Sequence, residues 1–289
     1  MIRLINAEFF KLRKRLMTRV LLFVLMGVTA VACLVLLAIS RRVITGPGLG
    51  MMQGGAGTIN PLGLPLALPI ALSIISTLGA VLAVILSANS IGSEYSWRTI
   101  RTMLICSEGR LKLLGAKLIA VAALVLIGMV IGLATGFAMS LVTTAIGGYA
   151  FDFSFATSQF LWEQFLQFWR VFYVLVPYIL LGFLFAVVGR SVMPGSALGI
   201  GVLFLEPIAT AFMGTAGGWI ARIPDYLLAA NVRVITSMGS PPQFITAQPE
   251  AVISSQTTGT AHAFITLALY NIVFIAAAFY LFRKRDVTG

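Results

Sequence analysis

Long apolar stretches alternate with short polar ones along the whole chain. Six of the apolar stretches are long enough to cross the roughly 30 Å hydrocarbon core of a bilayer as an α-helix. They are continuously apolar, whereas the strands of a membrane β-barrel alternate with a period of two. The pattern therefore predicts a single all-α polytopic transmembrane domain, with spans at about 20–40, 67–89, 113–146, 171–188, 192–214 and 262–282.

The segments outside these spans are amphipathic or loop-like. In residues 1–19 apolar side chains recur on one helical face. This favours an interfacial helix with its apolar stripe toward lipid or, equally well, a plain cluster of orienting charges. Residues 150–170 mix aromatic and amide side chains, which predicts a second interfacial helix. Residues 215–260 form the largest connection, with an amphipathic element at 219–228 and a loop beyond it. The stripe in the first segment comprises Ile2, Ile5, Phe9, Leu12 and Leu16.

Residues 91–117 form a charge-rich island between two apolar stretches. Lipid cannot form hydrogen bonds with the polar groups of such a segment, so the segment must lie in water or against another protein. A helix over 97–105, capped by Ser96, would place Trp97, Ile100 and Leu104 on one face. The charged residues of the island are Glu94, Arg98, Arg101, Glu108, Arg110, Lys112 and Lys117.

Composition agrees with a membrane protein and charge gives its orientation. Hydrophobic residues make up 59% of the chain and the formal net charge is +11. The basic residues cluster at span ends, where they contact lipid headgroups, so we expect no nucleic-acid partner. With both termini in the cytoplasm, 15 of the 20 Lys and Arg residues lie inside. The positive-inside rule therefore predicts a multi-pass protein of the cell membrane with residues 91–117 in the cytoplasm.

The sequence carries few candidates for chemistry. It contains no phosphate-binding loop, no zinc motif and no Cys/His cluster, since its two cysteines, Cys33 and Cys106, are far apart. The acid that lies deepest in a predicted span is Glu206, followed by Pro207. A carboxylate at mid-bilayer normally faces a partner or a water-filled cavity. Glu206 and Pro207 are therefore candidates for a transport path or gate, with a hydrogen bond between helices as the alternative.

Two sets of glycines mark close helix packing. Small residues four apart form a ridge that lets a neighbouring helix approach. We expect packing faces of this kind in the third and fifth spans. The glycines concerned are Gly128, Gly132 and Gly136 in the third span, and Gly195 and Gly199 in the fifth.

The charged island resembles the first intracellular segment of ABC-2 type transporter permeases. The resemblance is carried by Glu94-Tyr95, by Thr99-Ile100-Arg101, and by Ser107, Arg110 and Lys117. Arg98 stands where the family usually has glycine. The sequence around Ile223–Leu227 with Asn231, and the ending 281–287, also look like the family, so the resemblance covers nearly the whole chain.

The resemblance implies the membrane subunit of an exporter. In that family the island is a coupling helix that docks on a separate ATPase, which binds ATP and magnesium, so we expect no cofactor in this chain and no enzymatic activity of its own. A second permease subunit, identical or paralogous, and membrane lipids would be its other partners. The expected docking residues in segment 91–112 are Glu94, Tyr95, Trp97, Arg98, Thr99, Ile100, Arg101, Leu104 and Arg110.

An ATP-independent channel or secondary carrier is the alternative. Secondary carriers are often built from inverted repeats, and residues 1–145 show no convincing similarity to residues 146–289. The spans also offer no chain of ionisable residues for a proton or sodium relay. The sequence therefore favours an energy source outside the chain.

Overall fold

The computed structural model describes residues 2–45, 64–97, 110–147, 156–215, 219–238 and 259–284. These residues are almost entirely helical and contain no strand. The helices are α1 (Ile2–Lys14), α2 (Leu16–Thr45), α3 (Leu64–Ser96), α5 (Arg110–Gly147), α6 (Ser158–Gly189), α7 (Val192–Thr215), the 3-10 helix η2 (Ile220–Tyr226), α8 (Leu228–Ser237) and α9 (Thr260–Lys284).

Six of these helices are long and apolar enough to cross a membrane. They are α2, α3, α5, α6, α7 and α9, and each contains one of the six predicted spans. The protein is therefore a polytopic α-helical membrane protein, as the length of its apolar stretches predicted.

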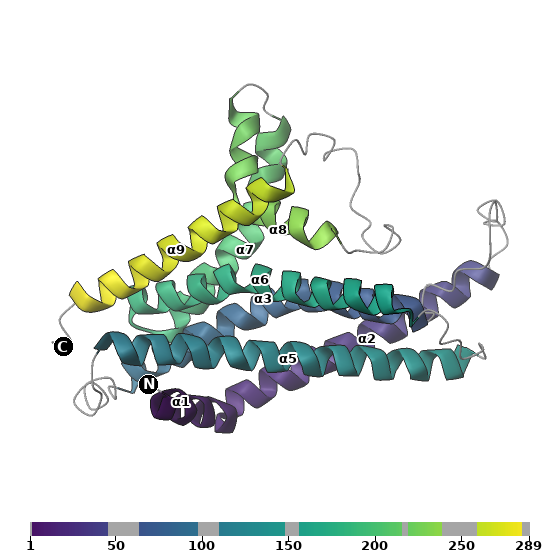
Figure 1. The fold of residues 1–289 in the computed structure, drawn as a ribbon, viewed down its shortest axis with the longest axis horizontal. Helices are drawn as coiled ribbons and strands as arrows, with labels where there is room; N and C mark the ends of the chain where they lie inside the picture. Colours follow the sequence, from purple (N-terminus) through teal and green to yellow (C-terminus); the bar gives the residue numbers. More distant parts are fainter. Residues whose placement is uncertain are drawn as a thin grey trace.

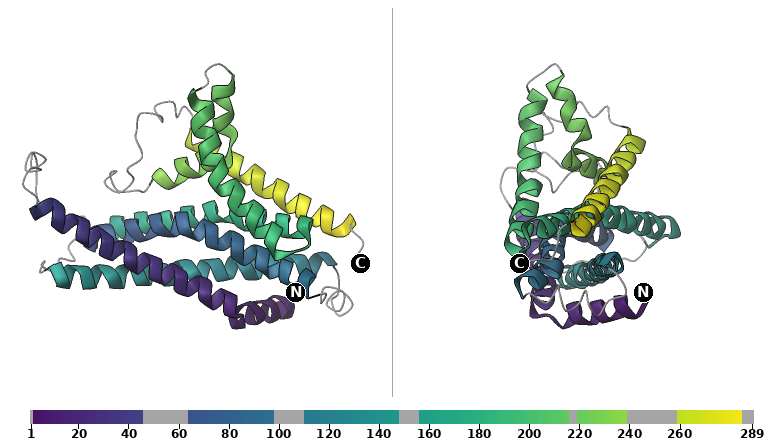
Figure 2. Two further views of the ribbon diagram at one scale, coloured as in Figure 1. Left: turned by 180° about the vertical axis from the view of Figure 1, so that it is seen from behind. Right: turned by 90° about the vertical axis from the view of Figure 1, so that its left-hand side faces the viewer.

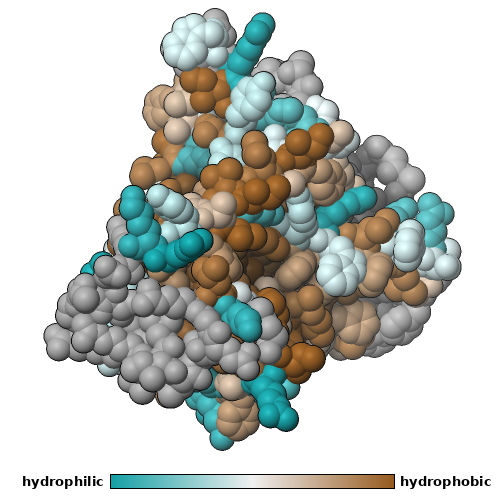
Figure 3. Space-filling model, turned by 60° about the vertical axis from the view of Figure 1, so that its left-hand side comes forward, coloured by the Kyte–Doolittle hydropathy of each residue, from teal (hydrophilic) through white to brown (hydrophobic). Residues whose placement is uncertain are grey.

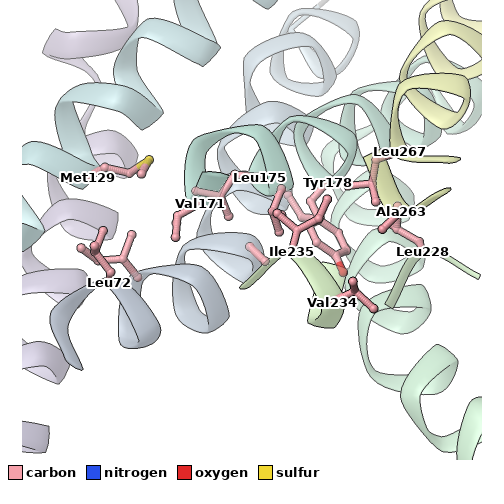
Figure 4. Close-up of a cluster of buried hydrophobic side chains, with 14 of the residues drawn as sticks. Leu72, Met129, Val171, Leu175, Tyr178, Leu228, Val234, Ile235, Ala263 and Leu267 are labelled. Carbon is pink, nitrogen blue, oxygen red and sulfur yellow. The ribbon is translucent and has the colours of Figure 1, made fainter. Parts of the chain in front are cut away.

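Four long helices form the body of the molecule. Figure 1 shows α2, α3, α5 and α6 running in roughly the same direction, with α7, α8 and α9 on one side of them. The main core lies where these two groups meet, and it combines α3, α6, α8 and α9. In Figure 4, Ile235 of α8 and Leu267 of α9 lie beside Tyr178 of α6. The short α8 is thus packed into the body of the protein.

The chain ends and the flanks of the charged island share one end of the molecule. The start of α1, the end of α3, the start of α5 and the end of α9 lie together there (Figures 1 and 2). A second core fixes this arrangement, because Ile91 of α3, Leu114 of α5, Phe183 of α6 and Phe282 of α9 are all buried in it. We call this region the charged end.

Helix α1 lies across the long helices. Figure 2 shows it nearly perpendicular to them when the molecule is viewed along their length. Leu12 is 1% exposed and packs with Phe9 against α3 and α5. This part of the predicted apolar stripe therefore faces protein and not lipid, whereas Ile2 and Leu16 are exposed.

Several helices extend beyond the predicted spans. Helix α3 continues to Ser96, so Ile91–Ser96 belong to a transmembrane helix and not to a polar connection. Helix α6 begins at Ser158, so the aromatic segment expected to form its own interfacial helix is continuous with the fourth span. No helix-breaking residue separates the two segments in the sequence. At 1.5 Å per residue, the 32 residues of α6 reach roughly 48 Å, well beyond the hydrocarbon core.

The glycine ridge of α5 makes close contacts over part of its length. A Cβ atom added at Gly136 would lie 2.5 Å from Cβ of Ala71 in α3, and one at Gly132 would lie 3.0 Å from Ile75. At Gly128 such an atom would meet nothing within 4 Å. Gly132 and Gly136 therefore let α3 approach, and Gly128 makes no such close contact with the described residues.

The glycines of α7 also lie at a helix contact. A Cβ atom at Gly195 would lie 2.6 Å from Cβ of Ala186 in α6, and one at Gly199 would lie 2.5 Å from Val84 in α3. The tight turn before α7 depends on Arg190, whose φ of 51° places it in the left-handed region. This turn rests directly on α3, because a Cβ at Gly92 would lie 2.6 Å from the backbone nitrogen of Val192.

Candidate functional site

A buried cluster of four charges joins three helices at the charged end. Oε1 of Glu94 in α3 accepts hydrogen bonds from Nζ of Lys11 in α1 and Nζ of Lys117 in α5, both at 2.6 Å. Nζ of Lys117 also donates to Oε2 of Glu8 in α1 at 2.7 Å. Two carboxylates thus balance two ammonium groups. We call Glu8, Lys11, Glu94 and Lys117 the charge cluster.

The charge cluster is largely shielded from its surroundings. The side chain of Glu94 is 0% exposed and that of Lys117 is 2% exposed. Removing a charged group from water costs several kcal/mol, and deleting one partner of a buried pair costs about 3–5 kcal/mol because the other charge is left unpaired. The cluster therefore fixes α1 against the end of α3 and the start of α5.

Arg15 extends this contact beside the charge cluster. Its Nη1 donates to Oγ of Ser93 at 2.6 Å and to the backbone oxygen of Asn89 at 3.3 Å. Its guanidinium carbon lies 5.3 Å from the centre of the Trp97 ring. A cation this close to an indole face is attracted by the ring quadrupole. The junction of α1 and α2 is therefore bound to the last two turns of α3.

The predicted docking residues fall into three groups. Trp97 is 65% exposed directly after α3, as a surface anchor would be. Tyr95 is partly buried against the core of the charged end, and Glu94 is fully buried in the charge cluster. The structure thus gives Glu94 an internal partner, so its contribution to any docking is indirect. The third group lies outside the described residues and comprises Arg98, Thr99, Ile100, Arg101 and Leu104. The side chain of Arg110 also lies outside them.

Ser96 is the last residue of α3. Its hydroxyl donates to the backbone oxygen of Gly92 at 3.0 Å. The helix over 97–105 that Ser96 is predicted to cap lies outside the described residues from residue 98 onward, so this cap stays a prediction. Hydroxyls of Ser and Thr within helices commonly bond one turn back in this way.

Glu206 forms a second site, away from the charge cluster. Its Oε1 accepts a hydrogen bond of 2.8 Å from the backbone N–H of Ala229, in the first turn of α8. The N–H of Leu228 also bonds to this carboxylate. Leu227 precedes α8 and has no polar side chain with which to cap it. Glu206 of α7 therefore supplies the cap, where the partial positive charge of a helix N-terminus attracts an anion.

The carboxylate of Glu206 is only partly satisfied. Its Oε2 is buried and has no hydrogen-bond partner among the described residues. Pro207 follows directly inside α7 and has no N–H to donate to the carbonyl of Leu203 one turn back. The hydrogen bond between helices, one of the two interpretations of Glu206, is observed, and a place of Glu206 and Pro207 in a transport path stays a prediction.

The segment η2–α8 is also tied to α9 and to itself. The hydroxyl of Tyr270 in α9 donates to the backbone oxygen of Tyr226 at 3.0 Å. Asn231 is 1% exposed, and its Nδ2 donates to the backbone oxygens of Asp225 and Leu227 at 2.9 and 2.7 Å. His262 lies edge-on to Tyr226, with 5.3 Å between ring centres. His262 is therefore a packing residue here, and it belongs to no cluster of three or more potential metal ligands within the described part of the chain.

Together these features define a class: a polytopic helical membrane protein whose described residues include six candidate spans, a buried charge cluster and a helix-capping carboxylate. Residues 57–288 match DUF2705, a family whose description is protein of unknown function. The match covers most of the chain, so the protein belongs to this family. No curated protein matches the chain.

Proposed function

We propose that this protein is the membrane-spanning permease subunit of an ATP-binding cassette exporter in the cell membrane, with both termini in the cytoplasm. The segment 91–112 would couple it to a separate ATPase subunit that binds ATP and magnesium. A second permease subunit, identical or paralogous, would complete the translocation path.

The observation that carries this proposal is the charge cluster at the two ends of the coupling segment. Glu94 precedes residues 98–109 by one turn of α3, and Lys117 follows them by two turns of α5. Both side chains bind α1. A force applied to the segment would therefore move α1, α3 and α5 as one unit, because breaking the cluster exposes unpaired buried charge.

Trp97 provides a contact surface at the start of the coupling segment. It is exposed at the end of α3, and Arg15 holds its ring from the side of α1. Exposed tryptophans with apolar neighbours are frequent anchors of protein interfaces. Energy must then come from a partner, since the sequence holds no phosphate-binding loop.

The later spans present an apolar surface on which a second permease subunit would bind. Phe204, Leu205 and Phe212 of α7, and Ile265 and Leu269 of α9, are all more than half exposed. Figure 3 shows apolar side chains gathered over the middle of one face, with hydrophilic ones around them. Lipid or another helical subunit must cover such a surface.

Co-purification tests the coupling. Tagged protein expressed in its native host should retain an ATPase that carries a phosphate-binding loop, identified by mass spectrometry. Trp97→Ala combined with Arg101→Glu should abolish this retention while membrane insertion is unchanged. The matched control is Trp219→Ala, since Trp219 is 75% exposed and lies outside the coupling segment. Retention of the ATPase by the double variant would contradict the proposal.

An ATP-independent channel or secondary carrier is the second candidate, and Glu206 is the observation that favours it. Carboxylates within spans are common in ion-coupled pathways. Proteoliposomes that contain this chain alone separate the two functions. Transport driven by an ion gradient without any ATPase, and lost in Glu206→Gln, would support the carrier and refute the permease.

A further inference from the structure

The fold sorts the charges of the N-terminal segment into two groups. Residues 2–19 contain six basic residues and one acid, Glu8. Glu8, Lys11 and Arg15 turn inward, where they meet Lys117, Glu94 and Ser93. The remaining cations, Arg3, Arg13, Lys14 and Arg19, are exposed. Because the acid is buried, the outer surface of this segment carries positive charge only.

Apolar side chains accompany the exposed cations. Ile2 is 76% exposed, Phe10 58% and Leu16 78%. Nζ of Lys14 lies 4.3 Å from the centre of the Phe10 ring, so a cation and an apolar ring occupy one patch. We call Arg3, Phe10, Arg13 and Lys14 the outer face of α1. Mixed basic and apolar faces of this kind are typical of helices that bind the headgroup region of anionic membranes.

The orientation of α1 fits the same surface. The helix lies nearly perpendicular to the long helices (Figure 2) and is fixed at their charged end by the charge cluster. If the long helices cross the bilayer, α1 runs along its surface. Within the described residues, none of the outer-face cations forms an ion pair with an acid of this chain. This part of the chain therefore leaves the outer-face charge available to an anionic partner.

We propose that the outer face of α1 is a binding surface for the phosphate headgroups of anionic lipids. Arg3, Arg13 and Lys14 contact the phosphates, and Phe10 inserts among the adjoining acyl chains. The buried ion pairs of Glu8 and Lys11 hold the helix with this face outward. The inference does not depend on ATPase coupling, since it needs only anionic lipid in the leaflet at the charged end.

A spin label on the outer face tests the proposal in the full-length chain. Ala7 is exposed between Arg3 and Phe10. Ala7→Cys is labelled with a nitroxide in a Cys33→Ala, Cys106→Ser background and reconstituted in nanodiscs of phosphatidylcholine, with or without phosphatidylglycerol. We expect phosphatidylglycerol to lower the accessibility of the label to a water-soluble relaxation agent several-fold.

The variant Arg3→Gln, Arg13→Gln, Lys14→Gln should lose this lipid effect. Each basic residue near an anionic surface contributes roughly a fivefold gain in binding. Loss of three should therefore lower the affinity about 100-fold and release co-purified phosphatidylglycerol, counted by native mass spectrometry. Arg222→Gln with Arg233→Gln is the matched control and should keep both signals.

Two outcomes would overturn the proposal. The label could remain equally accessible to water in both lipid mixtures, or the triple variant could keep the full effect of phosphatidylglycerol. Protection that appears in pure phosphatidylcholine only when an acidic protein partner is added would also refute it, because that partner and not lipid would then occupy the outer face.

Discussion

Glu94 and Glu206 are both carboxylates on apolar helices, but they are held in different ways. Glu94 lies between two ammonium groups supplied by two other helices. Glu206 accepts hydrogen bonds from the amides of one short helix. The first arrangement is a balanced set of charges. The second is a single anion stabilised by backbone dipoles.

The difference indicates at which of the two sites the polar contacts between helices cost less free energy to separate. Separating the charge cluster leaves buried ions unpaired on three helices, whereas moving α8 from Glu206 exposes two amides and one carboxylate. The polar contacts at the charged end are therefore the more costly of the two sets to separate. At Glu206, η2 and α8 are tied to α7 and α9 by hydrogen bonds, and α8 is also packed in the main core.

The largest effect is expected at the centre of the charge cluster. Lys117→Met removes the cation shared by Glu8 and Glu94 and should destabilise the protein by roughly 3–5 kcal/mol. Thermal unfolding in detergent measures the loss, with Arg13→Ala on the exposed side of α1 as the control. In a double-mutant cycle, Lys117→Met and Glu94→Gln should cost less together than the sum of their separate costs. Simple additivity would show that the pair is not coupled.

The next effect is expected where the turn before α7 rests on α3. Gly92→Ala places a Cβ against the backbone of Val192, which cannot rotate away, so we expect a loss of about 1–3 kcal/mol. Gly201→Ala is the matched control, because a Cβ there meets nothing within 4 Å. Equal melting temperatures for the two variants would contradict this contact.

A smaller effect is expected at Glu206. Glu206→Ala removes the cap of α8 and should cost about 0.5–2 kcal/mol, in the range of other N-cap deletions. Glu206→Gln keeps an acceptor oxygen and should cost less. Hydrogen exchange of the amides in Leu228–Ser237 measures the local stability of α8. We expect the fastest exchange in Glu206→Ala, slower exchange in Glu206→Gln and the slowest in the wild type. If α8 exchanges at the same rate in all three, Glu206 does not hold it.

The smallest effect is expected at Trp97. Its ring contacts Arg15 at an exposed site, where such a contact contributes about 0.5–1 kcal/mol. Trp97→Ala should therefore lower the melting temperature only slightly, and Trp97→Phe less. A large drop would mean that Trp97 is a structural residue, and its effect on ATPase binding could then not be interpreted as docking.

The sequence predicted the spans well but placed two of their ends poorly. The fifth span, expected at 192–214, is observed as Val192–Thr215. This agreement follows because Gly189–Ser191 interrupts the apolar pattern. The end of α3 and the start of α6 were missed because both contain polar residues, some of which face other helices. Ser93 and Gln167 bond to Arg15 and to the backbone of Thr236, so polarity there does not mark the end of a helix.

The candidate site was only partly accessible from sequence. The charged island was recognisable as exceptional because charge is rare in this chain, and Glu206 because it is the acid deepest in a predicted span. The helix α8 and its cap were not recognisable from the sequence, since Leu227 provides no capping side chain. That cap comes from another helix, and local patterns cannot report it.

The sequence by itself determined that the chain is a polytopic helical membrane protein, because the length of an apolar run is a local property that the bilayer thickness selects. Only the tertiary structure decided which charges are buried. Glu8 and Lys117 are 109 residues apart, and Lys11 and Glu94 are 83 apart. Their pairing depends on how three helices cross, so it also decides which cations of α1 remain outside.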